Sequence, residues 1–128
     1  MECYMTKTFE PFYGKGIIGP LHSSPAVKRY AGNPILTAEQ VPFPCDLAFN
    51  AGTARFNGRY YMAFRYDAFM DGDRTKGLEI SGSGLAESVD GIHWTAHRQP
   101  VKFHWKGEEL LWCNDARLTV LENKMYLS

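Results

Sequence analysis

The feature that most constrains the fold is a tight turn between two strand-like segments. Asn57-Gly58 is a strong short signal for a β-hairpin, because both residues readily adopt the left-handed backbone that such turns need. Residues 48–56 before the turn are strand-like, and residues 59–66 after it are rich in aromatic side chains that suit strands. The sequence therefore predicts an antiparallel pair of strands joined at this turn.

Further segments continue the pattern. A polar loop is expected at residues 67–77, followed by a strand at residues 78–88. Two glycines inside that strand, at positions 82 and 84, indicate a bulge or a close approach of backbone. Asp90-Gly91 then predicts a second hairpin turn, with the return strand beginning in residues 92–95.

The end of the chain repeats the first hairpin after a shift of 65 residues. A strand at 118–121 meets a tight turn at 122–124, and an aromatic strand begins at residue 125. The shift places Asn50 on Asp115, and it aligns identical residues at Ala51 and Ala116 and at Tyr61 and Tyr126. Loops at 67–77 and 99–114 account for the long period.

Repeated β units without helices predict an all-β fold, a β-propeller built from four-stranded blades. We expect an irregular N-terminal arm at residues 1–29, because proline and glycine punctuate it, and a partial propeller at residues 30–128. About one and a half repeats are present, whereas propellers close with roughly four to eight blades. We therefore expect this sequence to supply about the first two blades of a fold that is incomplete at its C-terminal end.

Composition excludes several classes of partner. Hydrophobic residues make up 45% of the 128 residues and charged residues 22%, which is typical of globular chains. With 14 basic and 14 acidic residues and no basic cluster, neither a nucleic-acid nor a membrane partner is expected. The lack of a leader-like segment and the odd number of cysteines, which is 3, favour the cytoplasm. The histidines do not share zinc-like spacings with these cysteines, so we expect no metal site.

The repeat also suggests a site. The innermost strand of each propeller blade lines the axis, so residues that open those strands surround the mouth of one pocket. Asn50 and Asp115 would then be neighbours. If residues 115–118 form a strand, Asp115 and Arg117 face one side, and Ala116 and Leu118 face the other. The alternative is that the repeat is fold symmetry alone and that Asp115 is a solvated strand end.

Several segments together resemble glycoside hydrolase family 130, the β-mannoside phosphorylases and their relatives. The resemblance covers residues 30–128 and implies a five-bladed β-propeller. The matching segments are Tyr30-Ala31-Gly32-Asn33-Pro34-Ile35-Leu36, Phe49-Asn50-Ala51-Gly52, Tyr60-Tyr61-Met62-Ala63-Phe64-Arg65-Tyr66-Asp67, Gly84-Leu85-Ala86-Glu87-Ser88-Val89-Asp90-Gly91-Ile92-His93-Trp94 and Asn114-Asp115-Ala116-Arg117.

The resemblance implies roles for three residues. Asp115 matches the acid of a Glu-Asp-Pro-Arg-like motif, with Asn114 and Ala116 in place of the glutamate and proline. Asn50 matches a sugar-contacting position, and Arg65 matches the arginine of a Phe-Arg motif. We expect inverting cleavage of β-mannosides with inorganic phosphate as co-substrate, mannose 1-phosphate as product and no cofactor. Asp115 would be the general acid, with partial burial favouring its protonated form.

Alternatives remain open. The enzyme could be a β-mannoside hydrolase that uses water, or the chain could be a glycan-binding propeller or an inactive fragment. Asp67 and Glu87 are candidate hydrolytic bases, although solvation explains both. Arg65 could form an inter-blade salt bridge and contact no substrate, Arg117 is interpreted as the partner of a nearby carboxylate, and Trp112 could stack on a sugar or pack in the core. The sequence leaves a homo-oligomer open.

Overall fold

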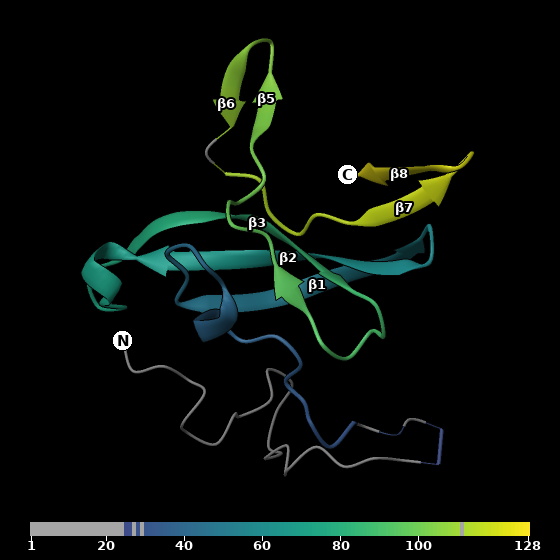
Figure 1. Cartoon of the computed structure of the whole chain (residues 1–128). Coiled ribbons are helices and arrows are strands. Elements are labelled where there is room, and N and C mark those ends of the chain that lie inside the picture. The colour runs from purple at the N-terminus through teal and green to yellow at the C-terminus, as the bar shows by residue number, and fades with distance from the viewer. Residues whose placement is uncertain (1–24, 27, 29, 111) are drawn as a thin grey trace. The chain divides into compact units, whose positions relative to one another are not determined.

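The computed structural model describes residues 25–26, 28, 30–110 and 112–128 (Figure 1). The chain divides into two units, Met1–Asn33 and Pro34–Ser128. Nearly all of the predicted arm at residues 1–29 lies outside the described residues. In the first unit, a hydrogen bond of 3.2 Å from the Asn33 backbone N–H to the Tyr30 carbonyl closes a turn. The candidate site residues all belong to the second unit.

The second unit is built on a four-stranded antiparallel sheet in which consecutive strands are neighbours (Figure 1). Its strands are β1 (Leu47–Phe56), β2 (Arg59–Phe69), β3 (Leu78–Ser88) and β4 (Thr95–Ala96). The only helical segments among the described residues are two short 3-10 turns, η1 (Ala38–Gln40) and η2 (Met70–Gly72). The all-β prediction is therefore confirmed. The predicted loop at 67–77 is wrong at its start, because β2 continues to Phe69.

Two further hairpins form separate two-stranded sheets (Figure 1). They comprise β5 (Phe103–Trp105) with β6 (Glu108–Leu110), and β7 (Leu118–Leu121) with β8 (Lys124–Leu127). The second of these hairpins was predicted. The β5–β6 hairpin lies in a stretch that was predicted to be a loop. It was missed because its turn begins with a lysine and not with an asparagine or aspartate. Lys106 has a φ of 50° and Gly107 a φ of 88°, which is again the left-handed pair of a tight hairpin turn.

The core lies on one face of the sheet. Met62, Phe64 and Tyr66 alternate along β2, so their side chains share this face, and all three are buried. Val41 and partly buried neighbours such as Phe43 pack against them. The rings lie close to the backbone of β3: a Cβ atom on Gly84 would be 2.3 Å from Cζ of Phe64. The predicted bulge or close approach of backbone is therefore not what these glycines serve, because the atoms nearest to them belong to the rings of Tyr66 and Phe64.

The 65-residue repeat is present in the backbone itself. The turn residues Asn57 and Gly58 have φ values of 47° and 77°, and the aligned Glu122 and Asn123 have 49° and 56°. Both hairpins thus use the turn in which both central residues are left-handed. Local turn chemistry therefore explains the predicted hairpins at both ends of the repeat.

The connection between β3 and β4 differs from the prediction. Asp90-Gly91 does not close a two-residue hairpin, and the return strand begins only at Thr95. The Asp90 carboxylate instead accepts backbone hydrogen bonds of 2.8 Å from both Ile92 and His93 and contacts the His93 ring at 2.6 Å. The hydrogen bond with the His93 side chain, followed by the backbone bonds, holds the pKa of Asp90 far below its usual value. This side-chain-capped loop replaces the expected tight turn.

Candidate functional site

Asn50 and Asp115 lie side by side, although 65 residues separate them. Asn50 Nδ2 donates a hydrogen bond of 3.0 Å to Asp115 Oδ1. Both residues have left-handed backbones, with φ values of 51° and 58°. Asn50 falls within the register shift between Phe49 and Gly52 in β1, where one strand is locally unpaired. The structure therefore brings together the two residues that the repeat predicts to be neighbours.

The segment that contains Asp115 is not the start of a strand. The strand begins at Leu118, and Asp115 is left-handed, so the proposed alternation along a strand does not apply there. Ala116 is nevertheless buried, while Asp115 and Arg117 are exposed. Exposed and buried positions thus alternate over residues 115–117 as predicted, although the backbone there is not that of a strand.

Arg117 fixes this segment against β1. Its Nη1 atom lies 3.1 Å from the Asn50 carbonyl oxygen, 3.0 Å from that of Asp115 and 3.1 Å from that of Ala116. The stem passes over Gly52, where a Cβ atom would be 2.9 Å from Arg117 Cδ. Within the described part of the chain Arg117 makes no ion pair, so the predicted carboxylate partner is wrong and backbone carbonyls take its place.

Arg65, the third predicted site residue, is bound to a carboxylate of its own strand. Its Nε and Nη2 atoms donate hydrogen bonds of 3.0 and 3.2 Å to the two oxygens of Asp67. The guanidinium also lies over the Phe49 ring, 4.9 Å from its centre. A guanidinium has five N–H donors, so three remain for other partners. Its charge is therefore already paired with that of Asp67.

Asp67 is buried, and the interpretation as a solvated loop residue is wrong. It lies in β2 opposite Ser81 of β3 and has an exposed fraction of 6%. Ser81 Oγ donates a hydrogen bond of 2.6 Å to Asp67 Oδ1. The same hydroxyl lies 2.8 Å from the side-chain amide of Asn114, the residue before Asp115. These contacts were missed because they depend on the register between two strands, although the period-2 spacing of Arg65 and Asp67 places both on one face.

Two other candidates are placed at the surface. Glu87 forms an exposed ion pair with Arg59 at 3.4 Å, so its solvated interpretation fits. Trp112 has an exposed fraction of 56%, which rules out core packing in this structure. Asp115 is also exposed, so the expected partial burial of this carboxyl is not met by the described residues alone.

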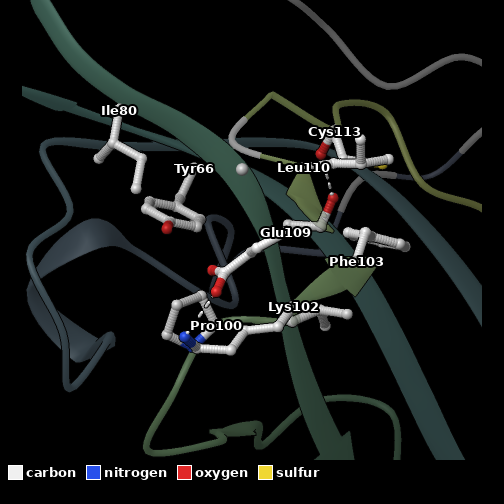
Figure 2. A pocket seen from close by; sticks show the side chains of 11 residues that line it. Tyr66, Ile80, Pro100, Lys102, Phe103, Glu109, Leu110 and Cys113 are labelled. Carbon is white, nitrogen blue, oxygen red and sulfur yellow. Dashed lines mark hydrogen bonds and ion pairs between the residues drawn. The ribbon is translucent and has the colours of Figure 1, made fainter. Parts of the chain in front are cut away.

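A small cavity lies along β3 beneath the β5–β6 hairpin (Figure 2). Tyr66, Ile80 and Pro100 line one part of it, and burial raises the pKa of the Tyr66 hydroxyl. Lys102 and Glu109 form an ion pair of 3.0 Å on the hairpin side. Asn50, Arg65 and Asp115 are not among the residues that line this cavity, so it is separate from the candidate site.

A scan against protein-family models and a search of curated proteins returned no match for this chain. Among the described residues, no helix has the length and apolar character needed to cross a bilayer. Nor do those residues contain a group of three or more side chains suited to hold a metal ion. The candidate site consists of Asn50 and Asp115, together with Arg117, which contacts the backbone of both.

Proposed function

We propose that this protein is an enzyme that cleaves β-mannosidic bonds with inversion, by phosphorolysis to mannose 1-phosphate. The observation that supports it best is the hydrogen bond between Asn50 and Asp115. The two residues occupy equivalent places in the repeat and meet where the irregular part of β1 lies against the segment that precedes β7. This is the arrangement expected when neighbouring propeller blades open onto one pocket.

The fold of the enzyme would be a five-bladed β-propeller. The meander β1–β4 has the strand order of one blade, with β1 innermost, and β7–β8 would begin the next. Contacts between β1 and β7 support this, since the inner strands of adjacent blades lie close together. The resemblance of residues 30–128 to family 130 supports the same assignment.

Asp115 would supply the proton for the departing sugar oxygen. A general acid must be protonated when the glycosidic bond breaks, and removal of water favours the protonated form of a carboxyl group. A sugar bound over Asn50 and Asp115 would exclude that water. Asn50 can donate to and accept from sugar hydroxyls, because a carboxamide has both kinds of group.

Arg65 would bind a sugar hydroxyl through its remaining donors. Phosphate is the attacking group in this reaction, so no second carboxylate is needed to activate water. Asp67 supports this view, since a carboxylate held by Arg65 and Ser81 is poorly placed to act as a base.

The test uses the complete product of the gene that encodes this sequence. It is incubated with mannobiose or mannosyl-glucose, with and without phosphate, and mannose 1-phosphate is measured. We expect product only with phosphate, and a loss of about 10²- to 10⁴-fold in kcat for Asp115→Asn, the usual contribution of a general acid. Asp71→Asn is the matched control, because Asp71 is exposed and, among the described residues, forms an ion pair with Lys76 alone.

Equal release of mannose without phosphate would show a hydrolase and contradict the phosphorylase assignment. Full activity of Asp115→Asn would contradict the site. Binding of the disaccharide without turnover would leave a glycan-binding protein as the better description.

A further inference from the structure

A chain of four polar side chains crosses the face of the sheet opposite to the core. It runs from Arg65 to Asp67 in β2, then to Ser81 in β3, and ends at Asn114. Asn114 is covalently joined to Asp115, so this series of hydrogen-bonded side chains ends one residue before the proposed acid. None of these four side chains belongs to the aromatic core, which lies on the other face of the sheet.

Asp67 is the centre of the network. It accepts two hydrogen bonds from Arg65 and one from Ser81, and these satisfy most of its acceptor sites. Buried carboxylates need such partners, because an unpaired charge away from water is costly. Asp67 therefore holds a fixed orientation, and Ser81 must point its proton toward it.

The donor pattern sets the orientation of Asn114. Ser81 has one hydroxyl proton, and the 2.6 Å contact to the carboxylate uses it. The carboxamide oxygen of Asn114 lies 2.8 Å from the same hydroxyl, but Ser81 has no second proton to donate. A half-turn of the carboxamide brings Nδ2 to this position, where it donates to Ser81 Oγ while Ser81 donates to Asp67.

A second serine secures the same segment. Ser83 is fully buried, as Ser81 is, and its Oγ donates a hydrogen bond of 2.9 Å to the Cys113 carbonyl. The two serines alternate with Gly82 and so face the same side of β3. Residues 113 and 114 are thus both attached to β3 immediately before the left-handed Asp115.

We propose that Asp67 is a positioning residue for Asp115, acting through Ser81 and Asn114. Asp67 touches no substrate and exchanges no proton in the reaction. It fixes the donor direction of Ser81, which fixes Asn114 and the backbone that presents the Asp115 carboxyl. This inference rests on the proposed function for its catalytic consequence, and on the hydrogen bonds alone for its structural one.

The network also explains why residue 114 is an amide. A carboxylate at this position would meet the lone pairs of Ser81 and the negative charge of Asp67 beyond it. Like charges at such short range are unfavourable, and Asp67 and Ser81 are both buried. The amide can donate to Ser81, whereas an acid cannot unless it is protonated.

The test is a double-mutant cycle between positions 67 and 114 in the complete protein. Asp67→Asn removes the charge, and Asn114→Asp adds one at the other end. We expect each single change to lower kcat about 10- to 100-fold, with KM altered less than about threefold, because a misplaced acid slows the chemical step more than binding. The double variant again has one acid and one amide, so we expect it to recover at least about tenfold over the worse single variant.

Controls separate positioning from general stability. Asp71→Asn and Asn57→Asp make the same chemical changes at exposed or turn positions and should leave kcat within about twofold. The fraction of folded protein is measured for every variant. If the activity losses merely follow that fraction, or if the double variant shows the sum of the single losses, the positioning role is contradicted.

Amide hydrogen exchange at residues 113–116 provides a readout that needs no activity. Each single variant should speed exchange in this segment, and the double variant should reverse the change. Additive exchange would overturn the inference even in an active enzyme. An inactive wild type with coupled exchange would contradict the proposed function and uphold the network.

Discussion

The two copies of the repeat share their turn conformation but have very different surroundings. The first copy, β1–β2, and the second, β7–β8, each place a left-handed polar residue seven positions before a turn with two left-handed residues. Yet β2 contains several buried side chains, among them Met62 and Phe64, whereas β7 and β8 contain none. The turn therefore defines the hairpin, and the neighbouring strands determine how much of it is buried.

The difference arises from pairing. β2 has a partner on each side, β1 and β3, and an apolar cluster covers one of its faces. Among the strands that the structure describes, β7 and β8 pair only with each other. Hydrophobic stabilisation follows the apolar area removed from water, so equal local sequence patterns contribute unequally to the free energy of folding.

The largest expected effect comes from removing an aromatic ring in the first copy. Phe64→Ala should lower the free energy of unfolding by about 3–5 kcal/mol, because Phe64 is 2% exposed and lies against Gly84. Tyr126→Ala in the second copy should cost less than about 1 kcal/mol, since Tyr126 is 45% exposed. Urea unfolding measures both. Similar losses would show that the second hairpin is as tightly packed as the first.

A smaller effect is expected from exchanging the turns. Glu122 has to adopt a left-handed backbone that costs most residues about 1–2 kcal/mol, whereas Asn-Gly adopts it readily. The double change Glu122→Asn with Asn123→Gly should stabilise β7–β8 by about 1 kcal/mol and slow amide exchange there about fivefold. Exchange in β1–β2 serves as the internal control. Faster exchange in β7–β8 would mean that the Glu122 side chain, and not the backbone, stabilises this turn.

The last prediction concerns a thiol that packs against the core of the first copy. Burial raises the pKa of Cys45 from its ordinary value of 9.0 to about 11. The folded state thus binds this proton more tightly, so its contribution to stability is complete below pH 9 and is lost as the pH rises toward 11. In a Cys3→Ser, Cys113→Ser variant, iodoacetamide at pH 8 should label Cys45 about 100-fold more slowly than it labels the urea-unfolded chain. Equal rates would show that this side of the core is open to water.

Much of the fold follows from local sequence signals. Asn57-Gly58 and the aromatic alternation predicted β1 and β2, and the shift of 65 residues predicted that Asn50 and Asp115 would meet. These succeed because turn geometry and side-chain alternation are set by residues close in sequence. The β5–β6 hairpin was missed because Lys106-Gly107 lacks the usual first turn residue.

The surroundings of the candidate site could not be predicted in the same way. The environment of Asp67 depends on its pairing with Ser81, and that of Arg117 on carbonyls from a strand far away in sequence. From the sequence, the alternation of polar residues in β2 and β3 indicates only which of them share a face within one strand. Only the register and the packing of segment 112–117 turn these residues into a network.

The left-handed backbone at Asn50 and Asp115 has a consequence for how this pair can change. Asparagine and aspartate are the two residues other than glycine that tolerate this conformation best. Each position can therefore exchange an amide for an acid by replacing one terminal group, without refolding the chain. Asn50→Asp would place two carboxyl groups about 3 Å apart, and such a pair holds a shared proton to much higher pH than a single acid does. Single substitutions at these two positions can thus change the proton chemistry of the pair without changing the backbone that holds it.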